Sequence, residues 1–178
     1  MKLLRTIRLD VSDTFVFEKA AEPGEWAVSG AFVFWDRDLS ALEGKARSAF
    51  RGGFLGVASL GWSTLVQIVE ASDEDRSGMV DTLARQLVHN FGAPTLAQAR
   101  AAAEEEVAFA ESLCNQPQDT LVAVHRSYDD GDVRETFRTL RPRAGQKPAR
   151  AFSFLEVEGE DEPVEAVDLI GMAERERK

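Results

Sequence analysis

Residues 120–140, TLVAVHRSYDDGDVRETFRTL, carry the clearest β-strand pattern in the chain. Two segments rich in β-branched and aromatic residues flank Asp130-Gly131, a dipeptide typical of the two-residue turn of a β-hairpin. Such a turn fixes the register of the two strands. One face then pairs Tyr128 with Val133, Arg126 with Glu135, Val124 with Phe137 and Val122 with Thr139, and the other face is more polar. We therefore predict an antiparallel hairpin.

Further strand patterns lie on both sides of this hairpin. Each is a short run with alternating or β-branched apolar residues, bounded by turn signals such as Pro23-Gly24. These runs are residues 2–9, 14–17, 26–34, 63–70 and 151–158, with a weaker one at 54–59.

Three helices are predicted from apolar periodicity and from end signals. Residues 41–51 form a short helix that ends before Gly52-Gly53. Ser72 precedes three carboxylates and an apolar stripe that ends at Phe91, and Thr95 opens an alanine-rich helix that extends to about Asn115. The last two helices should pack as a helical hairpin, because the second has a stripe of small residues.

This order of elements predicts an α+β fold, with a mainly antiparallel sheet covered by the short helix and the long helical hairpin. Residues 27–127 could also follow the βαββαβ order of a ferredoxin-like core. The length favours a single domain, which we place at residues 1–157. Residues 158–178 are then an acidic C-terminal tail that is partly ordered at most.

The composition disfavours several classes of function. A formal charge of −10 disfavours nucleic acids and anionic membranes as partners. The chain lacks the apolar run of a signal peptide or a membrane span. Cys114 is the single cysteine, which excludes an intramolecular disulfide and suits a reducing compartment. We therefore expect a cytoplasmic protein without nucleic-acid or membrane partners.

No motif identifies catalysis, a metal or a cofactor. His89, His125 and Cys114 lie on three different predicted elements, too few and too scattered for a zinc site. Neither the nucleophile elbow GxSxG nor a glycine-rich phosphate-binding loop is present. We expect no metal, no cofactor and no catalytic residues.

The stretch AFVFWDRDLSALE, residues 31–43, changes abruptly from apolar to charged. Ser40 and Glu43 fit a helix capping box, so we interpret WDRD as a strand-to-helix junction with a salt-bridged turn. Trp26, Trp35 and Trp62 are predicted to pack in the core. The alternative is a pocket between sheet and helices, whose candidate binding residues are Trp35, Asp36, Arg37, Asp38, His125 and Arg126.

A basic cluster follows the hairpin. It could bind an anionic partner, although the acidic residues further along the chain could equally neutralise it. The candidate residues are Arg138, Arg141, Arg143, Lys147 and Arg150.

The segments MKLLRTIRLD, FEKAAEPGEWAVSGAFVFWDRD, GKARSAFRGGFLGVASLGWSTLVQIVEA and LARQLVHNFGAP together resemble an uncharacterised family of alphaproteobacterial proteins, a domain of unknown function. The resemblance covers residues 1 to about 140. It implies a bacterial cytosolic protein and a loose link to the maturation of molybdenum-dependent formate dehydrogenase, and it transfers no site residues.

Two functions follow as hypotheses. The first is a non-catalytic accessory protein that acts through protein–protein interaction, with a protein partner still to be identified and possibly as a homodimer. The alternative is a small-molecule-binding protein or an enzyme with a pocket between sheet and helices. We favour the first, because the chain offers few nucleophiles and metal ligands.

Overall fold

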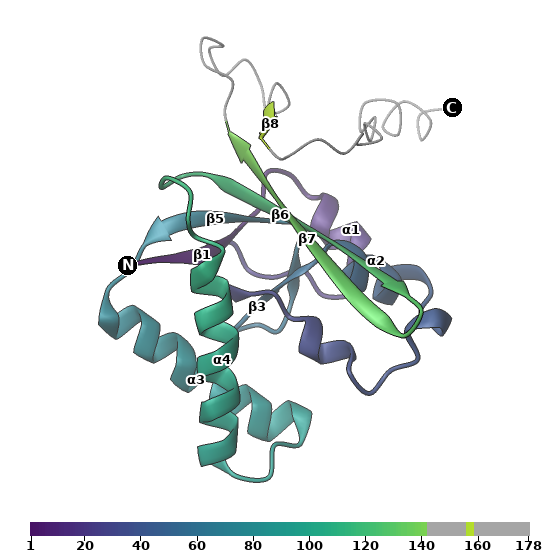
Figure 1. Cartoon of the computed structure of the whole chain (residues 1–178), viewed down its shortest axis with the longest axis horizontal. Helices are drawn as coiled ribbons and strands as arrows, with labels where there is room; N and C mark the ends of the chain where they lie inside the picture. The colour runs from purple at the N-terminus through teal and green to yellow at the C-terminus, as the bar shows by residue number, and fades with distance from the viewer. Residues whose placement is uncertain (142–155, 159–178) are drawn as a thin grey trace.

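The computed structural model describes residues 1–141 and the backbone of residues 156–158. Within them, two antiparallel sheets are combined with helices, which confirms the predicted α+β class (Figure 1). The larger sheet has the order β1 (Lys2–Ile7), β5 (Leu65–Glu70), β6 (Leu121–Asp129), β7 (Asp132–Arg141) and β8 (Glu156–Glu158). The smaller sheet consists of β2 (Ala27–Val28), β3 (Phe54–Gly56) and β4 (Trp62–Ser63). The α-helices are α1 (Ser12–Val16), α2 (Gly44–Gly52), α3 (Asp73–Phe91) and α4 (Leu96–Ser112), and the 3-10 helices are η1 (Ala31–Phe34) and η2 (Leu39–Ala41).

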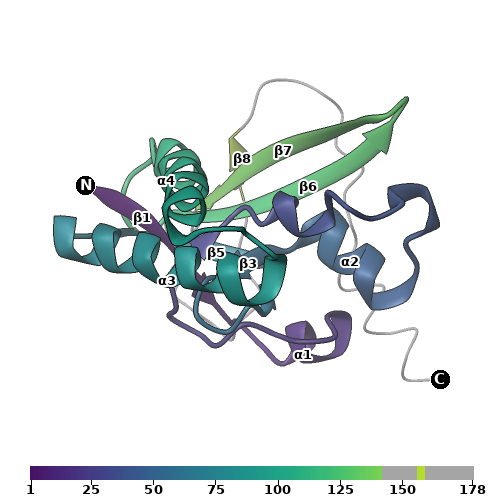
Figure 2. The ribbon, with the colours of Figure 1, turned by 90° about the horizontal axis from the view of Figure 1, so that it is seen from below.

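The β6–β7 hairpin has the predicted register. Tyr128 pairs with Val133 and Arg126 with Glu135, and the remaining predicted pairs also form. The turn residues Asp130 and Gly131 have φ angles of 48° and 88°, the left-handed values that a tight hairpin turn needs. Figures 1 and 2 show this hairpin extending away from α3 and past α2.

The predicted helical hairpin is α3 and α4. Ser72 Oγ accepts a hydrogen bond from the Asp75 amide at 3.1 Å, and the Asp75 carboxylate accepts one from the Ser72 amide at 2.9 Å. Thr95 caps α4 by accepting from the Gln98 amide at 3.2 Å. The small-residue stripe of α4 is buried, as predicted, at Ala99, Ala103, Val107 and Ala110. The N-terminal caps and the buried stripe of small residues together explain why the positions and the packing of these two helices could be predicted from the sequence.

The ferredoxin-like arrangement does not form, although the weak strand predicted at 54–59 is present as β3. It requires the four strands between residues 27 and 127 to share one sheet, but β2 and β3 belong to the smaller sheet and β5 and β6 to the larger one. β5 instead pairs with the N-terminal strand β1 along its whole length. Long-range pairing of this kind is decided by tertiary packing and cannot be deduced from element order.

Two predicted strands are largely helical. Residues 14–16 belong to α1 and Phe17 is its C-cap residue; Phe17 is buried while Phe15 is exposed. In the run 26–34 only Ala27–Val28 forms a strand, because Gly30 takes a left-handed φ of 80° and turns the chain into η1. The alternation of Phe32 and Phe34 imitates a strand pattern. In the structure, the Phe32 ring and the Phe34 ring pack against different residues.

The C-terminal predictions lie mostly beyond the described part of the chain. Of the strand predicted at 151–158, the structure describes β8, which pairs antiparallel with the end of β7. Residues 142–155 and, apart from the backbone of Glu158, the acidic tail predicted at 158–178 lie outside the described residues.

Candidate functional site

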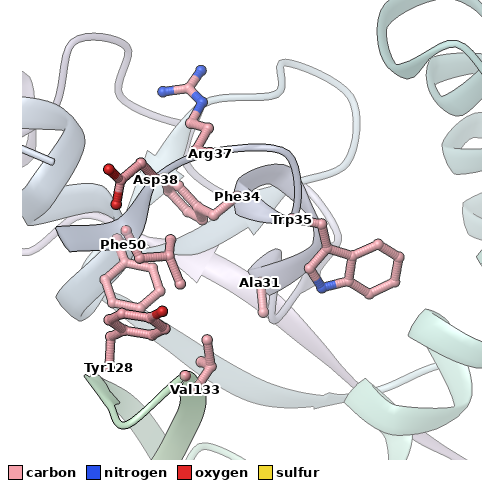
Figure 3. A pocket seen from close by; sticks show the side chains of 10 residues that line it. Ala31, Phe34, Trp35, Arg37, Asp38, Phe50, Tyr128 and Val133 are labelled. Atoms are coloured by element: carbon pink, nitrogen blue, oxygen red, sulfur yellow. The ribbon is translucent and has the colours of Figure 1, made fainter. Parts of the chain in front are cut away.

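A concavity of about 320 Å³ lies between the η1–η2 segment and the tip of the β6–β7 hairpin (Figure 3). We name it the hairpin-tip concavity. Its lining side chains are mainly aromatic and aliphatic, with one arginine and one aspartate among them. They are Ala31, Phe34, Trp35, Arg37, Asp38, Leu39, Phe50, Tyr128, Gly131 and Val133.

Gly30 sets the path of the chain that carries this site. A Cβ at Gly30 would lie 2.6 Å from Leu55 Cβ and 3.0 Å from the Trp62 ring, so a larger residue does not fit. After this turn, the amides of Val33, Trp35 and Arg37 donate in succession to carbonyls three residues earlier, at 3.1–3.2 Å. The segment that ends in Trp35 and Arg37 is therefore a continuous helical turn with fixed backbone hydrogen bonds.

Two buried phenylalanines of η1 hold this segment against neighbouring elements. Phe32 packs edge-on against Phe91 of α3 at a centroid distance of 5.3 Å. Phe34 packs against Phe50 of α2 at 5.3 Å and against Trp62 at 5.4 Å. Because each ring is held by a different element, η1 is fixed both to α3 and to the α2–β4 region.

Trp35 itself is exposed, contrary to the prediction that it packs in the core. Trp35 is 77% exposed, and its ring packs edge-on against Phe32 with 6.4 Å between the ring centroids. Trp62 is buried, as predicted, whereas Trp26 is only half-buried against the edge of the core. Figure 3 shows the Trp35 indole projecting outward at one end of the concavity, while Phe50 and Tyr128 lie next to each other at the other end.

The charged junction after Trp35 is not a salt-bridged turn. In the described part of the chain Arg37 has no ion pair, and its guanidinium lies over the Phe34 ring, 5.8 Å from the centroid. Asp38 caps η2 by accepting from the amide and the hydroxyl of Ser40, and these hydrogen bonds lower the pKa of Asp38. The predicted capping box is also wrong, because Glu43 becomes the N-cap residue of α2 without a side-chain cap.

Arg126 is the largest fully buried side chain among the described residues, at 0% exposure. Its Nε donates to Glu135 at 2.6 Å. One terminal nitrogen donates to the carbonyls of Phe50 and Gly53 at 3.1 and 2.7 Å, and the other donates to the carbonyl and the hydroxyl of Ser29. All five N–H groups of the guanidinium are thus used. Arg126 supports the floor of the site and is not one of its lining residues.

A second carboxylate lies near this arginine. Phe109, in the last turn of α4, packs against Phe137 of β7 with 5.7 Å between the ring centroids, so the C-terminal end of α4 lies against β7. Burial, together with the nearby Glu135 carboxylate, raises the pKa of Glu106 to about 7, and Arg126 opposes this rise. Glu106 therefore changes its charge near neutral pH, close enough to Arg126 and Glu135 for their charges to shift its pKa.

None of the other predicted site residues that the structure describes lines the concavity. His125 is on the opposite, exposed face of β6, and burial together with Arg51 and Arg138 lowers its pKa. Asp36 is exposed next to the lining residues. Of the predicted anionic-partner patch, Arg138 is half-buried and the Arg141 side chain donates to Gln116. Arg143, Lys147 and Arg150 lie outside the described residues.

The structure therefore brings Trp35, Arg37 and Asp38 into one site and separates them from His125 and Arg126. The remaining lining residues were not predicted: Ala31, Phe34, Leu39, Phe50, Tyr128, Gly131 and Val133. A signal was available for two of them, because the predicted register already pairs Tyr128 with Val133 beside the turn. Phe50 carried no such signal, since helical spacing indicates only that it is buried.

Comparisons with known proteins place these observations in a family context. Within residues 1–141 and 156–158, no helix combines the length and apolar character needed to cross a bilayer, and no three or more His, Cys, Asp and Glu side chains are grouped so as to hold a metal. A family model described as a family of unknown function (DUF6505) matches residues 1–153. No curated protein and no solved structure matches the chain.

Proposed function

The chain belongs to DUF6505, a family of unknown function, and we propose that it is a non-catalytic accessory protein that acts by binding another protein through the hairpin-tip concavity. The observation that carries this proposal is the exposed Trp35 on a helical turn with fixed backbone hydrogen bonds. Tryptophan, tyrosine and arginine are the residue types enriched in the energetically dominant part of protein interfaces. Trp35, Tyr128 and Arg37 all line this concavity.

The rigidity of η1 supports the same proposal. An exposed aromatic side chain that is held in place before binding loses little conformational freedom when a partner covers it. Phe32 and Phe34 are both buried and hold the turn from below. Phe91, which contacts Phe32, is itself 38% exposed, so apolar surface continues from Trp35 towards the end of α3.

A small molecule is the alternative ligand, because about 320 Å³ lies at the lower end of the range for ligand pockets. The exposure of the lining favours a protein instead. Tyr128 and Val133 are 44% and 42% exposed in addition to Trp35, so a small ligand would bury only part of its own surface. A protein partner covers such a shallow site more completely.

We place this role in the bacterial cytoplasm, as the single cysteine and the family resemblance suggest. The same resemblance makes maturation factors of molybdenum-dependent formate dehydrogenase the first partners to test. A second copy of the chain is the other partner to test, by measuring the mass of the purified protein in solution.

Replacing Trp35 with alanine should remove partner binding without unfolding the chain. Loss of a central interface tryptophan costs about 2 kcal/mol or more, which is about thirtyfold in affinity. The measurement is affinity capture from lysate of the source cells with quantitative mass spectrometry. Phe15→Ala is the matched control, because Phe15 is a similarly exposed aromatic residue on α1 (71%). If Trp35→Ala captures the same proteins as the wild type in equal amounts, the proposal is contradicted.

A further inference from the structure

Negative charges outnumber positive charges around the hairpin-tip concavity. Asp36 and Asp38 belong to the segment between η1 and η2, and the turn of the β6–β7 hairpin adds further carboxylates on either side of the lining residue Gly131. The hairpin carboxylates are Asp129, Asp130 and Asp132. All five aspartates are exposed. Arg37 is the only cation among the lining residues.

Apart from the neighbouring Arg37, the lining residues that the structure describes bring no cation to these carboxylates. The ion pairs formed by residues 1–141 involve other acidic side chains, and none of these five aspartates takes part. Asp129 and Asp132 lie directly opposite each other on β6 and β7, where like charges destabilise a hairpin. A cationic partner would relieve that repulsion.

We infer that the partner segment that occupies the hairpin-tip concavity is a basic stretch of polypeptide with one apolar or aromatic anchor side chain. This inference rests on the proposed function, because the concavity and the exposed Trp35 define the site and the aspartates decide only which chemistry it accepts. The anchor side chain packs in the concavity against Tyr128 and Val133, beside the outward-pointing Trp35. Lysine or arginine residues on either side of the anchor lie near the aspartates of the rim.

Complementary charges of this kind act over a longer range than apolar contacts. They raise the association rate and select against acidic partners, and added salt weakens them because they are exposed. The net charge of −10 excludes other acidic surfaces in the same way. A basic segment is therefore favoured both at the site and over the whole molecule.

The test is selection of a random peptide library displayed on phage against the full chain, with Trp35→Ala used for counter-selection. The best peptides are then synthesised, and their affinity is measured for the wild type and for Asp129→Asn/Asp132→Asn. The matched control is Glu70→Gln/Glu105→Gln, which removes the same charge from exposed positions on β5 and α4. We expect peptides rich in lysine and arginine around one apolar residue. We also expect the aspartate double variant, but not the control, to bind them about five- to tenfold more weakly at low salt.

The outcomes separate this inference from the proposed function. Peptides that depend on Trp35 but lack excess lysine and arginine, or that bind the aspartate double variant as tightly as the wild type, overturn the inference and leave the proposed function in place. If no enriched peptide depends on Trp35, the proposed function fails as well.

Discussion

We expect the substitution Arg126→Leu to lower the free energy of unfolding by about 3–5 kcal/mol. Leucine fills much of the space but donates no hydrogen bonds. The Glu135 carboxylate then loses its buried cation, and the carbonyls of Ser29, Phe50 and Gly53 lose their donor. Buried polar groups without partners are among the few single changes that destabilise a protein this strongly.

Urea denaturation followed by circular dichroism measures this effect. Arg134→Leu is the matched control, because Arg134 lies on the neighbouring strand of the same hairpin but is exposed. Its substitution should change the free energy of unfolding by no more than about 0.5 kcal/mol. The precision of such measurements is about 1 kcal/mol. If the free energy of unfolding of Arg126→Leu lies within that range of the wild-type value, Arg126 is not a structural support.

The second large effect is a pH-dependent gain of stability from Glu106→Gln. The unfolded chain titrates Glu106 near the ordinary value of 4.5, while the folded chain releases this proton only at about pH 7. The folded state therefore holds the extra proton between these values. The favourable contribution of the protonated group is complete below about pH 4.5 and is lost as the pH rises through 7.

Glutamine imitates the protonated carboxyl at every pH. At pH 8 we expect Glu106→Gln to raise the free energy of unfolding by about 2 kcal/mol, a value reduced for partial solvent screening, and at pH 4.5 to change it little. The measurement is urea denaturation at several pH values between 4.5 and 8. Glu105→Gln, an exposed neighbour on the same helix, should show no such pH dependence. An equal effect of Glu106→Gln at both ends of this range would contradict the raised pKa.

The parts of the fold that were predicted correctly depend on local chemistry. The Asp130-Gly131 turn fixes the hairpin register within the segment itself, and Ser72 and Thr95 mark the beginnings of α3 and α4 through hydrogen bonds to residues three positions away. These signals act over a few residues. They can therefore be read from the sequence before any tertiary contact is known.

The parts that were predicted wrongly depend on contacts between distant segments. Phe32 and Phe34 alternate as in a strand, but their partners are Phe91, Phe50 and Trp62, which no local pattern reveals. The split of the strands between two sheets has the same origin, because it is set by which strands pair across the whole chain.

The same reason limits prediction of the candidate site. Arg126 was correctly paired with Glu135 across the hairpin, yet its burial depends on carbonyls 73 to 97 residues earlier in the chain. Trp35 was predicted to be buried because it lies at strand spacing beside valine and phenylalanine residues. Its exposure became visible only when η1 replaced the expected strand.

The central proposal is that another protein covers the surface around Trp35, and photo-cross-linking in the source cells tests it most directly. A photoreactive phenylalanine analogue replaces Trp35 in one full-length variant and the equally exposed Phe15 in another. Irradiation should produce a discrete adduct of higher mass at position 35 and none at position 15. The absence of an adduct at position 35, under conditions in which the variant is folded and abundant, would contradict the proposal.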